Sequence, residues 1–317
     1  MHQMPIHEFS LIADLFAPLA TSKGALGLTD DVALLKPRAG RELVLTTDAI
    51  VAGIDFFPND PPETIARKAL RVNLSDLAAK GAEPVGYLLT LCLPRRINET
   101  WLRAFARGLA ADQKTFGLTL LGGDLSSTPG PLTISVTAFG SVPKGKAILR
   151  RGAQLDDLVF VSGTIGDSGG GLAALKAKRR APFLIDRYRV PQPRLALGRA
   201  LRGIASAALD VSDGLVADLG HLADASKMHI VIDAARIPLS AALRKAGGDI
   251  VRAATAGDDY EIAFTAPLAR RAKVFAAAKA AGVPVTQIGW VMKGRGVALL
   301  GKDGKPVKIG KTGWTHF

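Results

Sequence analysis

Lys68-Ala-Leu-Arg-Val-Asn-Leu-Ser-Asp-Leu-Ala-Ala-Lys-Gly-Ala82 predicts an amphipathic helix with a polar pair inside it. Leucines recur along it at helical spacing, a tandem Pro61-Pro62 opens the helix, and Gly81 ends it. Asp76 lies in mid-helix, where aspartate is a poor helix former, and Asn73 shares its face three residues earlier. A polar pair beside buried leucines needs a partner, and a cation is one candidate.

Strands and helices alternate on both sides of this helix. Strands are predicted over residues 42–47, 87–93, 118–121 and 132–139. A second helix begins at the capping residue Asn98 and ends near Gly117. We also expect a strand over 32–35 and a helix over 9–19, whose apolar stripe from Phe9 to Leu19 belongs to the core.

The sequence Val142-Pro-Lys-Gly145 is the best candidate for a domain boundary. It divides the chain into an N-terminal domain over 1–143 and a C-terminal domain over 144–317. In the second domain, strands are predicted at 158–161, 207–209, near 230 and near 262. Helices are predicted after 171, over 194–202 and from 212. An exposed basic connection is predicted over 179–193. Because both halves mix helices and strands, the fold class is α/β or α+β.

Charge is divided unequally between these halves. The 317 residues carry 41 Lys plus Arg and 28 Asp plus Glu, a formal net charge of +13, with −1 on residues 1–143 and +14 on residues 144–317. A basic half can bind nucleic acid, a membrane surface or an anionic small molecule. Because its basic residues are spread over many segments and aromatic residues make up only 6% of the chain, a solvated surface or a small anion is favoured over nucleic acid.

The composition also indicates a cellular compartment. The single cysteine, Cys92, excludes an intrachain disulfide framework and favours a reducing environment. Acidic residues interrupt the apolar start, unlike a signal peptide, and no apolar run approaches the roughly 18 residues of a membrane span. We therefore expect a soluble, cytoplasmic protein without a membrane partner.

Aspartate is far more frequent than glutamate, at 22 residues against 6. Short carboxylates suit turns, helix caps and hard cations. Besides the pair at 73 and 76, aspartate combines with glycine or hydroxyl residues in the segments 27–31, 46–48, 122–124, 210–214 and 257–261. Each segment alone is better explained as a turn or a cap, but several that converge in space are what Mg²⁺ ions bridging carboxylates to substrate phosphates require.

Two features could hold phosphate itself. The segment from Gly163 to Gly171 joins a strand to a helix, so its N–H groups could hold an anion at the helix N-terminus, although a tight turn explains it equally well. Arg150 and Arg151 follow the boundary and could neutralise phosphate. The sequence has no zinc-type spacing of His and Cys and no Gly-x-Ser-x-Gly motif, which argues against those two kinds of site.

Together these segments resemble the thiamine-monophosphate kinase family, within the superfamily that includes aminoimidazole ribonucleotide synthetase and selenophosphate synthetase. The matching motifs follow the family's order nearly from end to end. They are Glu8-Phe-Ser-Leu-Ile-Ala13, Asp30-Asp-Val-Ala-Leu-Leu35, Thr46-Thr-Asp-Ala-Ile-Val-Ala-Gly53, the stretch 68–82, Gly122-Gly-Asp124, Asp210-Val-Ser-Asp-Gly-Leu-Val-Ala-Asp-Leu-Gly-His221, Asp258-Asp-Tyr-Glu261 and Gly313-Trp-Thr-His-Phe317.

The resemblance implies ATP-dependent transfer of the γ-phosphoryl group onto the phosphate of thiamine monophosphate, with several Mg²⁺ ions, giving thiamine diphosphate and ADP. It implies the two-domain fold of aminoimidazole ribonucleotide synthetase with a C-terminal α/β domain. It also implies a homodimer in which the N-terminal domains, which bind metal and ATP, share a β-barrel.

Roles for individual residues follow from the same resemblance. The Mg²⁺ ligands would be Asp31, Thr46, Thr47, Asp48, Asp76, Asp124, Asp210 and Asp213, among which Asp48, Asp124 and Asp210 would be catalytic. ATP would be contacted by Gly123, Asp124, Arg150 and Ser212, and the thiamine substrate by Asp55, Asp258 and Trp314. Two positions depart from the family, because Asp55 stands where histidine is common and Asp258 where glutamate is usual.

Two alternatives stay open. The first keeps the fold and changes the reaction, to another ATP-dependent synthetase or small-molecule kinase of the superfamily. A selenophosphate synthetase is disfavoured, since a reactive cysteine near the N-terminus is missing from this sequence. The second is a basic nucleic-acid-binding protein without catalysis, for which affinity would fall steeply with salt.

Overall fold

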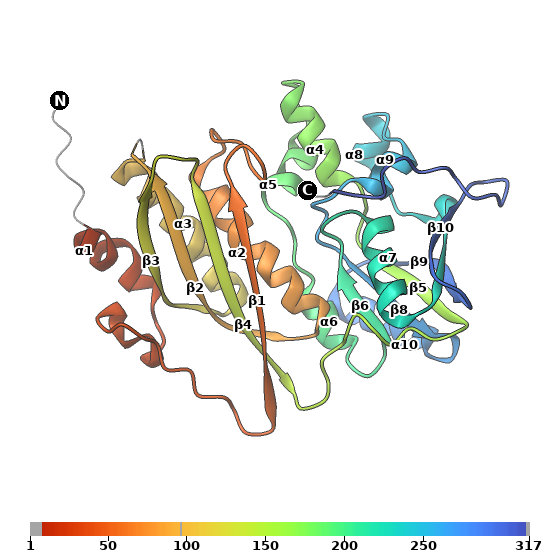
Figure 1. Ribbon diagram of the computed structural model, residues 1–317, viewed down its shortest axis with the longest axis horizontal. Helices are drawn as coiled ribbons and strands as arrows, with labels where there is room; N and C mark the ends of the chain where they lie inside the picture. The colour runs from red at the N-terminus through yellow and green to blue at the C-terminus, as the bar shows by residue number, and fades with distance from the viewer. Residues whose placement is uncertain (1–7, 96, 315–317) are drawn as a thin grey trace. The chain divides into compact units, whose positions relative to one another are not determined.

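The computed structural model describes residues 8–95 and 97–314, and its internal contacts divide the chain into two units (Figure 1). Unit 1 comprises Met1–Leu74 and Glu83–Lys144, and unit 2 comprises Ser75–Ala82 and Gly145–Phe317. The sequence suggests one boundary after residue 143, whereas here the end of a unit 1 helix also groups with unit 2. Both units mix helices and strands, which confirms the predicted α/β (α+β) class.

Unit 1 contains a sheet with two long helices. Its main elements are β1 (Arg41–Val51), α2 (Pro62–Ala79), β2 (Glu83–Pro94), α3 (Glu99–Phe116), β3 (Thr119–Thr128) and β4 (Thr133–Pro143). The strands lie in the order β1-β4-β2-β3, with β4 antiparallel to both neighbours and β2 parallel to β3. Figure 1 shows α2 and α3 against one face of this sheet.

Helix α3 has both of the ends that its sequence predicts. The Asn98 side chain accepts a hydrogen bond from the Trp101 N–H at 2.9 Å, and Gly117 ends the helix in the left-handed conformation. Its apolar side, which includes Phe105 and Leu109, is fully buried. The cap and the buried stripe together fix where this helix begins, where it ends and which side meets the sheet.

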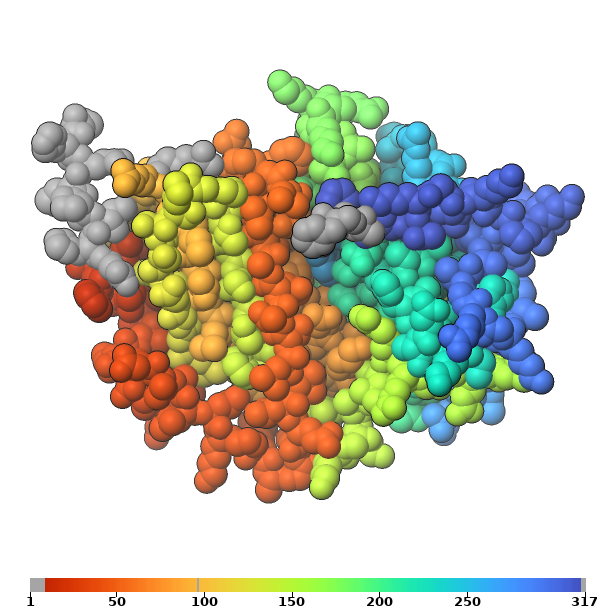
Figure 2. Space-filling model, in the orientation of Figure 1, coloured from red at the N-terminus to blue at the C-terminus, as the bar shows by residue number. Residues whose placement is uncertain are grey.

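The opposite face of the unit 1 sheet is open to solvent. On β4, Ile134 and Val136 are fully buried, whereas Ser135, which points to the other face, is only half-buried. In Figure 2 the strands of unit 1 lie side by side on the surface. Leu45 on β1 is 58% exposed there, so this face carries apolar surface.

Near the N-terminus, the helical prediction over 9–19 is confirmed for most of its apolar side, because Leu15, Phe16 and Leu19 are buried, whereas the strand over 32–35 is wrong. Residues 9–19 form three short helical pieces, α1 (Glu8–Leu11), a π-helical turn (Ile12–Phe16) and a 3-10 turn (Ala17–Leu19), and a further 3-10 segment spans Lys23–Leu28. Phe9 is 83% exposed and so lies outside the core. Residues 32–35 form no strand with another part of the described chain, and the apolar side chains of Val32 and Leu34 are exposed.

Unit 2 is a second helix-and-sheet unit. Its strands are β5 (Asp157–Ser162), β6 (Ala207–Asp210), β7 (His229–Asp233), β8 (Ile262–Pro267), β9 (Val285–Met292) and β10 (Gly296–Leu300), in the sheet order β10-β7-β9-β5-β8-β6. Its helices are α4 (Asp167–Lys176), α5 (Pro182–Arg189), α6 (Leu195–Ala200), α7 (Leu215–Ser226), α8 (Ala241–Lys245), α9 (Ile250–Thr255) and α10 (Arg271–Ala281), with 3-10 turns at Ala234–Arg236 and Leu268–Arg270.

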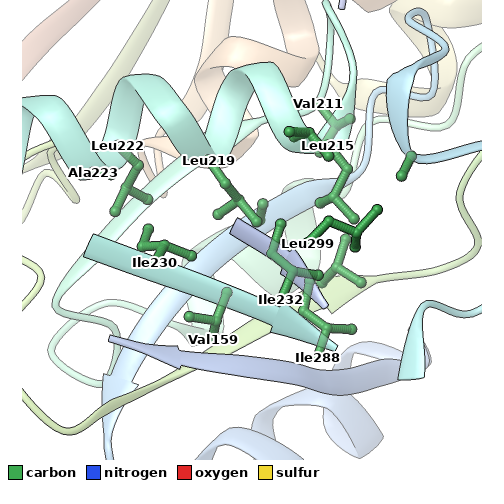
Figure 3. Close-up of a cluster of buried hydrophobic side chains, with 14 of the residues drawn as sticks. Val159, Val211, Leu215, Leu219, Leu222, Ala223, Ile230, Ile232, Ile288 and Leu299 are labelled. Carbon is green, nitrogen blue, oxygen red and sulfur yellow. The ribbon is translucent and has the colours of Figure 1, made fainter. Parts of the chain in front are cut away.

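The core of unit 2 lies between α7 and the sheet. Leu215, Leu219 and Leu222 recur at helical spacing and point from α7 toward Ile230 and Ile232 on β7 (Figure 3). All five side chains are fully buried. This packing fixes the start of α7, and therefore the loop that precedes it, against the sheet.

One more expectation fails in unit 2. The segment 179–193, predicted as an exposed basic connection, contains α5, and the Arg187 side chain on that helix is buried.

Across the part of the chain that the structure describes, no helix is both long enough and apolar enough to span a bilayer.

Candidate functional site

Asp48 and Asp124 lie on the two edge strands of the unit 1 sheet. Asp48 on β1 pairs with Val136 on β4, and Asp124 on β3 pairs with Thr90 on β2. Because β1 and β3 are separated by three strand spacings, the two backbone positions are roughly 14 Å apart. Both side chains are exposed, but the sheet by itself does not bring them to one cation.

The other predicted ligands of unit 1 lie on β1 or in loops. Thr46 and Thr47 directly precede Asp48 on the strand, and the Thr47 hydroxyl donates to the Val136 carbonyl oxygen at 3.2 Å. Asp31 is exposed in a bend that precedes β1. Thr46, Thr47 and Asp48 are consecutive on one edge strand, Asp31 precedes that strand in the chain, and their role as ligands stays a prediction.

Asp55 and Gly123 each have a structural reason for their identity. Asp55 Oδ2 accepts a hydrogen bond from the Val51 N–H at 2.7 Å, which closes the turn after β1. At Gly123 a Cβ atom would lie 1.8 Å from the Leu89 carbonyl oxygen, so only glycine fits against β2. These structural roles are compatible with the predicted substrate contact at Asp55 and the predicted ATP contact at Gly123, which stay predictions.

In unit 2, Asp76 and Asp210 come together beside Lys80. Burial raises the pKa of Asp210 well above its ordinary value, and the negative charge of Asp76 raises it further. Lys80 donates from Nζ to the Ala208 carbonyl oxygen at 2.8 Å, and burial lowers the pKa of this lysine while Asp210 and Asp76 oppose the shift. Two carboxyl groups beside a single, mostly buried ammonium group form a region that is negative when both are ionised, and a divalent cation would neutralise it.

The donor chemistry in this region fits a hard cation. The carboxylates of Asp76 and Asp210 are oxygen ligands, as Mg²⁺ prefers. On the same helix as Asp76, the Asn73 side chain donates from Nδ2 to the Ala69 carbonyl oxygen at 3.1 Å, while its buried Oδ1 accepts no hydrogen bond from the described residues. Within residues 8–95 and 97–314, however, no group of three or more His, Cys, Asp or Glu side chains could hold a metal ion.

The end of β6 and the loop after it carry three predicted site residues, Asp210, Ser212 and Asp213. The N–H groups of Ser212, Asp213 and Gly214 each donate to Oδ2 of Asp218, at 3.0 Å. Burial and the charge of Asp213 raise the pKa of Asp218 to about 7, against the lowering effect of the three N–H groups. The loop is therefore folded around a carboxylate from the first turn of α7, a residue that we did not predict as functional.

Two segments that are distant in sequence, around Asp258 and Trp314, donate hydrogen bonds to carbonyl oxygens of the same loop. The Asp258 N–H donates to the Ser212 carbonyl oxygen at 2.8 Å, and the Trp314 N–H donates to the Asp213 carbonyl oxygen at 2.9 Å. Asp258 has a φ of 68°, and its Oδ1 accepts a hydrogen bond from the Tyr260 hydroxyl at 3.2 Å. The structure thus brings together residues predicted separately for ATP, metal and substrate. The last three residues of the 313–317 motif lie outside the described residues.

Arg150 is also near this part of unit 2. Its charge contributes to the lowered pKa of Lys80, and its side chain is exposed. The neighbouring backbone is fixed, because the Ala208 N–H donates to the Leu149 carbonyl oxygen at 2.9 Å. An exposed guanidinium group next to the paired carboxylates is suitably located for a phosphate.

The glycine-rich segment 163–171 does not present a vacant anion site. The buried Asp259 side chain occupies it, since its carboxyl group accepts from the Gly166 N–H at 2.6 Å and from the Ser168 N–H at 3.2 Å. Burial raises the pKa of Asp259 well above its ordinary value, while these N–H groups oppose the shift. The segment 163–171 is therefore better explained as a tight turn than as a phosphate site. The N–H groups at the start of α4 are satisfied by the Asp259 side chain.

A second buried carboxylate follows two residues later. Glu261 accepts from the guanidinium groups of Arg187, at 2.8 Å, and Arg194, at 2.7 Å, and from the Ser162 hydroxyl at 2.6 Å. Together Asp259 and Glu261 anchor the chain directly after Asp258. Sequence reasoning missed these arginines because their partner lies far away in the chain.

Comparison with known proteins agrees with the motifs. Residues 29–142 match the N-terminal domain family of AIR synthase related proteins, and residues 154–302 match the corresponding C-terminal domain family. The thiamine-monophosphate kinase of Caulobacter vibrioides is 44% identical over 322 residues, a match that covers 98% of this chain and 91% of the relative.

Two solved structures share the fold. The thiamine-monophosphate kinase from Stenotrophomonas maltophilia K279a has a TM-score of 0.85 at 40% identity, covering 96% of this chain and 99% of that chain. AaThiL complexed with AMPPCP and TMP has a TM-score of 0.79 at 32% identity, covering 100% of both chains. These matches extend over both units and confirm the resemblance seen in the motifs: the chain belongs to the thiamine-monophosphate kinase family.

Proposed function

We propose that the protein is an ATP-dependent thiamine-monophosphate kinase. The observation that carries the proposal is the meeting of Ser212, Asp213, Asp258 and Trp314 around one loop of unit 2. These are positions at which the family's motifs imply contacts to ATP, metal and thiamine. The complex of a family member with AMPPCP and TMP supports a nucleotide triphosphate and thiamine monophosphate as the two ligands.

The proposed reaction is a direct phosphoryl transfer. A phosphate oxygen of thiamine monophosphate forms a bond to the γ-phosphorus of ATP, and the bond from that phosphorus to the β–γ bridging oxygen breaks. The bridging oxygen keeps the electron pair and leaves on ADP. Because the acceptor is already an oxyanion, the reaction needs positioning and charge neutralisation more than it needs a general base.

The acidic residues are proposed to hold Mg²⁺, which when bound neutralises phosphate charge and orients the transferring group. The ligands would be Asp31, Thr46, Thr47, Asp48, Asp76, Asp124, Asp210 and Asp213. Support comes from the oxygen-only donor set and from the Asp76 and Asp210 pair, where the pKa of Asp210 is raised by burial and by its neighbour. Arg150 and Ser212 would contact the nucleotide phosphates, and Gly123 would allow close backbone approach.

The thiamine moiety is proposed to bind near Asp258 and Trp314. The Trp314 side chain is 52% exposed, and the Lys311 ammonium group lies 5.3 Å from its ring centroid, so the ring already attracts a cation. The thiazolium ring of thiamine is cationic as well and suits an aromatic face and a carboxylate. Asp55 would likewise favour the thiazolium ring rather than the phosphate.

A homodimer is part of the proposal. The open face of the unit 1 sheet, with Leu45 58% exposed, supports pairing with a second copy into a shared β-barrel. The single cysteine supports a reducing, cytoplasmic location.

The proposal is tested by following ADP formation from ATP and Mg²⁺ with and without thiamine monophosphate. ADP release that depends on thiamine monophosphate supports the kinase. Release that depends instead on another phosphorylated acceptor supports a different member of the superfamily. No acceptor-dependent ADP, together with salt-sensitive binding of DNA or RNA, would favour the nucleic-acid alternative.

A further inference from the structure

A single carboxylate oxygen organises the loop before α7. Oδ2 of Asp218 accepts hydrogen bonds from three successive N–H groups, those of Ser212, Asp213 and Gly214, each at 3.0 Å. Successive backbone N–H groups of this kind form a concave site that binds anions. Here the anion is a side chain from the first turn of the following helix.

The geometry of this contact is demanding. Asp218 is 3% exposed and lies on α7 between Leu215, one turn earlier, and Leu219, the next residue, both of which belong to the core of unit 2. Gly214 has a φ of 132°, a conformation that L side chains rarely adopt, and its N–H donates to the carboxylate. The helix is therefore anchored by its apolar face, and its carboxylate in turn fixes the loop.

The loop is held from both sides. Its N–H groups bind Asp218, while the carbonyl oxygens of Ser212 and Asp213 accept from the N–H groups of Asp258 and Trp314, at 2.8 and 2.9 Å. These hydrogen bonds hold the backbone from Ser212 to Gly214 in the observed shape, with Asp210 and Asp213 on either side of Ser212 in the chain. Asp218 itself is a poor candidate for a metal ligand, because Oδ2 already accepts three hydrogen bonds and the side chain is buried.

We propose that Asp218 is a positioning residue, which holds the 210–214 loop in the shape needed to bind Mg²⁺ together with the nucleotide. This inference rests on the proposed function for the identity of the ligand. The arrangement of the loop around Asp218 does not depend on it. Residues that orient the groups around a metal in this way commonly change its affinity about 10- to 100-fold when replaced.

The test compares the full-length protein with Asp218→Ala, Asp218→Asn and the control Asp224→Asn, which alters an exposed aspartate on the same helix. Amide hydrogen exchange at residues 212–214 reports the loop directly. Calorimetry of AMPPCP binding at a series of Mg²⁺ concentrations reports the ligand. For Asp218→Ala we expect faster exchange at these three amides and about a 10-fold or greater rise in the Mg²⁺ concentration for half-maximal binding.

Asp218→Asn keeps an oxygen acceptor and should fall between wild type and Asp218→Ala in both measurements, while Asp224→Asn should match wild type. Unchanged exchange and unchanged Mg²⁺ dependence in Asp218→Ala would overturn the proposal. If Asp218→Ala fails to fold, Asp218→Asn provides the test. Wild-type hydrogen exchange and wild-type Mg²⁺ dependence in Asp218→Asn would then contradict a positioning role. Wild-type protein that binds no AMPPCP with Mg²⁺ would refute the proposed function, and the exchange measurement would still test the role of Asp218 in the loop.

Discussion

Lys80 donates a hydrogen bond from Nζ to the carbonyl oxygen of Ala208, at 2.8 Å. This bond fixes a mostly buried ammonium group beside Asp76 and Asp210, whose charges partly offset the lowering of the lysine's pKa by burial. The lysine is thus an internal counter-ion for the pair of carboxylates proposed to hold Mg²⁺.

Replacing Lys80 with methionine should destabilise the protein in Mg²⁺-free buffer. Removing the ammonium group takes away its hydrogen bond to Ala208 and the positive charge nearest to two half-buried carboxyl groups, so we expect the free energy of unfolding to fall by about 2 kcal/mol. Urea unfolding of Lys80→Met and of Lys279→Met, which alters an exposed lysine of α10, measures the difference. An equal, small effect of both substitutions would refute the counter-ion role.

Glu261 should be among the most sensitive positions in unit 2. Glu261→Gln removes the charge shared by Arg187 and Arg194, and we expect a loss of about 3 kcal/mol in unfolding free energy. The matched control is Glu99→Gln, whose partner Arg103 lies one helical turn away on the surface, with an expected loss within about 0.5 kcal/mol. Urea unfolding measures both variants. If Glu261→Gln and Glu99→Gln lower the free energy of unfolding by similar amounts, burial does not make the Glu261 ion pairs more important than the exposed one.

Asp259 should make stability fall as pH rises. Burial and the nearby charge of Asp167 raise its folded pKa well above the ordinary 3.8, although the Gly166 and Ser168 N–H groups and Arg187 oppose the shift. The folded protein therefore holds this proton more tightly, so the stability contribution is complete below pH 3.8 and is lost as pH rises through the folded pKa.

Asp259→Asn removes that titration. We expect the unfolding free energy of the variant to decline less steeply than that of wild type as pH rises from about 4 to about 8. Urea unfolding at several pH values compares the two slopes. Parallel curves would mean that Asp259 has the same pKa in the folded and unfolded chains.

Asp48→Asn and Asp124→Asn should each lower the rate of thiamine diphosphate formation by about 100-fold or more, because a lost metal ligand removes several kcal/mol of charge stabilisation. Both side chains are exposed, so we expect melting temperatures near that of wild type. Asp14→Asn, an exposed aspartate elsewhere in unit 1, is the control. Near-normal rates in the first two variants would remove them from the ligand set.

Sequence periodicity and capping predicted the elements whose signals are local. Helix α3 begins at its Asn98 cap and ends at Gly117, and β4 alternates buried and half-buried residues as expected. The strand predicted over 32–35 fails because an apolar run forms a strand only when another strand is available to pair with it. Phe9, in the first turn of the helical run over 8–19, is exposed, whereas Leu15, Phe16 and Leu19 further along it are buried.

The candidate site depends on partners that are distant in sequence. Gly166 and Asp259 are separated by 93 residues, so nothing local indicated that the glycine-rich turn would be filled by a carboxylate. Arg187 and Glu261, 74 residues apart, are a second case. Asp218 is closer to its loop, at four to six residues, and a carboxylate in the first turn of a helix is a signal that could have identified it.

The central claim is direct transfer of the γ-phosphoryl group to thiamine monophosphate, and ATP labelled at the γ-phosphate tests it most directly. The purified protein is incubated with labelled ATP, Mg²⁺ and thiamine monophosphate, and the products are separated. We predict one label in the terminal phosphate of thiamine diphosphate for each ADP formed. Label that appears only in inorganic phosphate, or no label in thiamine diphosphate while ATP is consumed, would contradict the account.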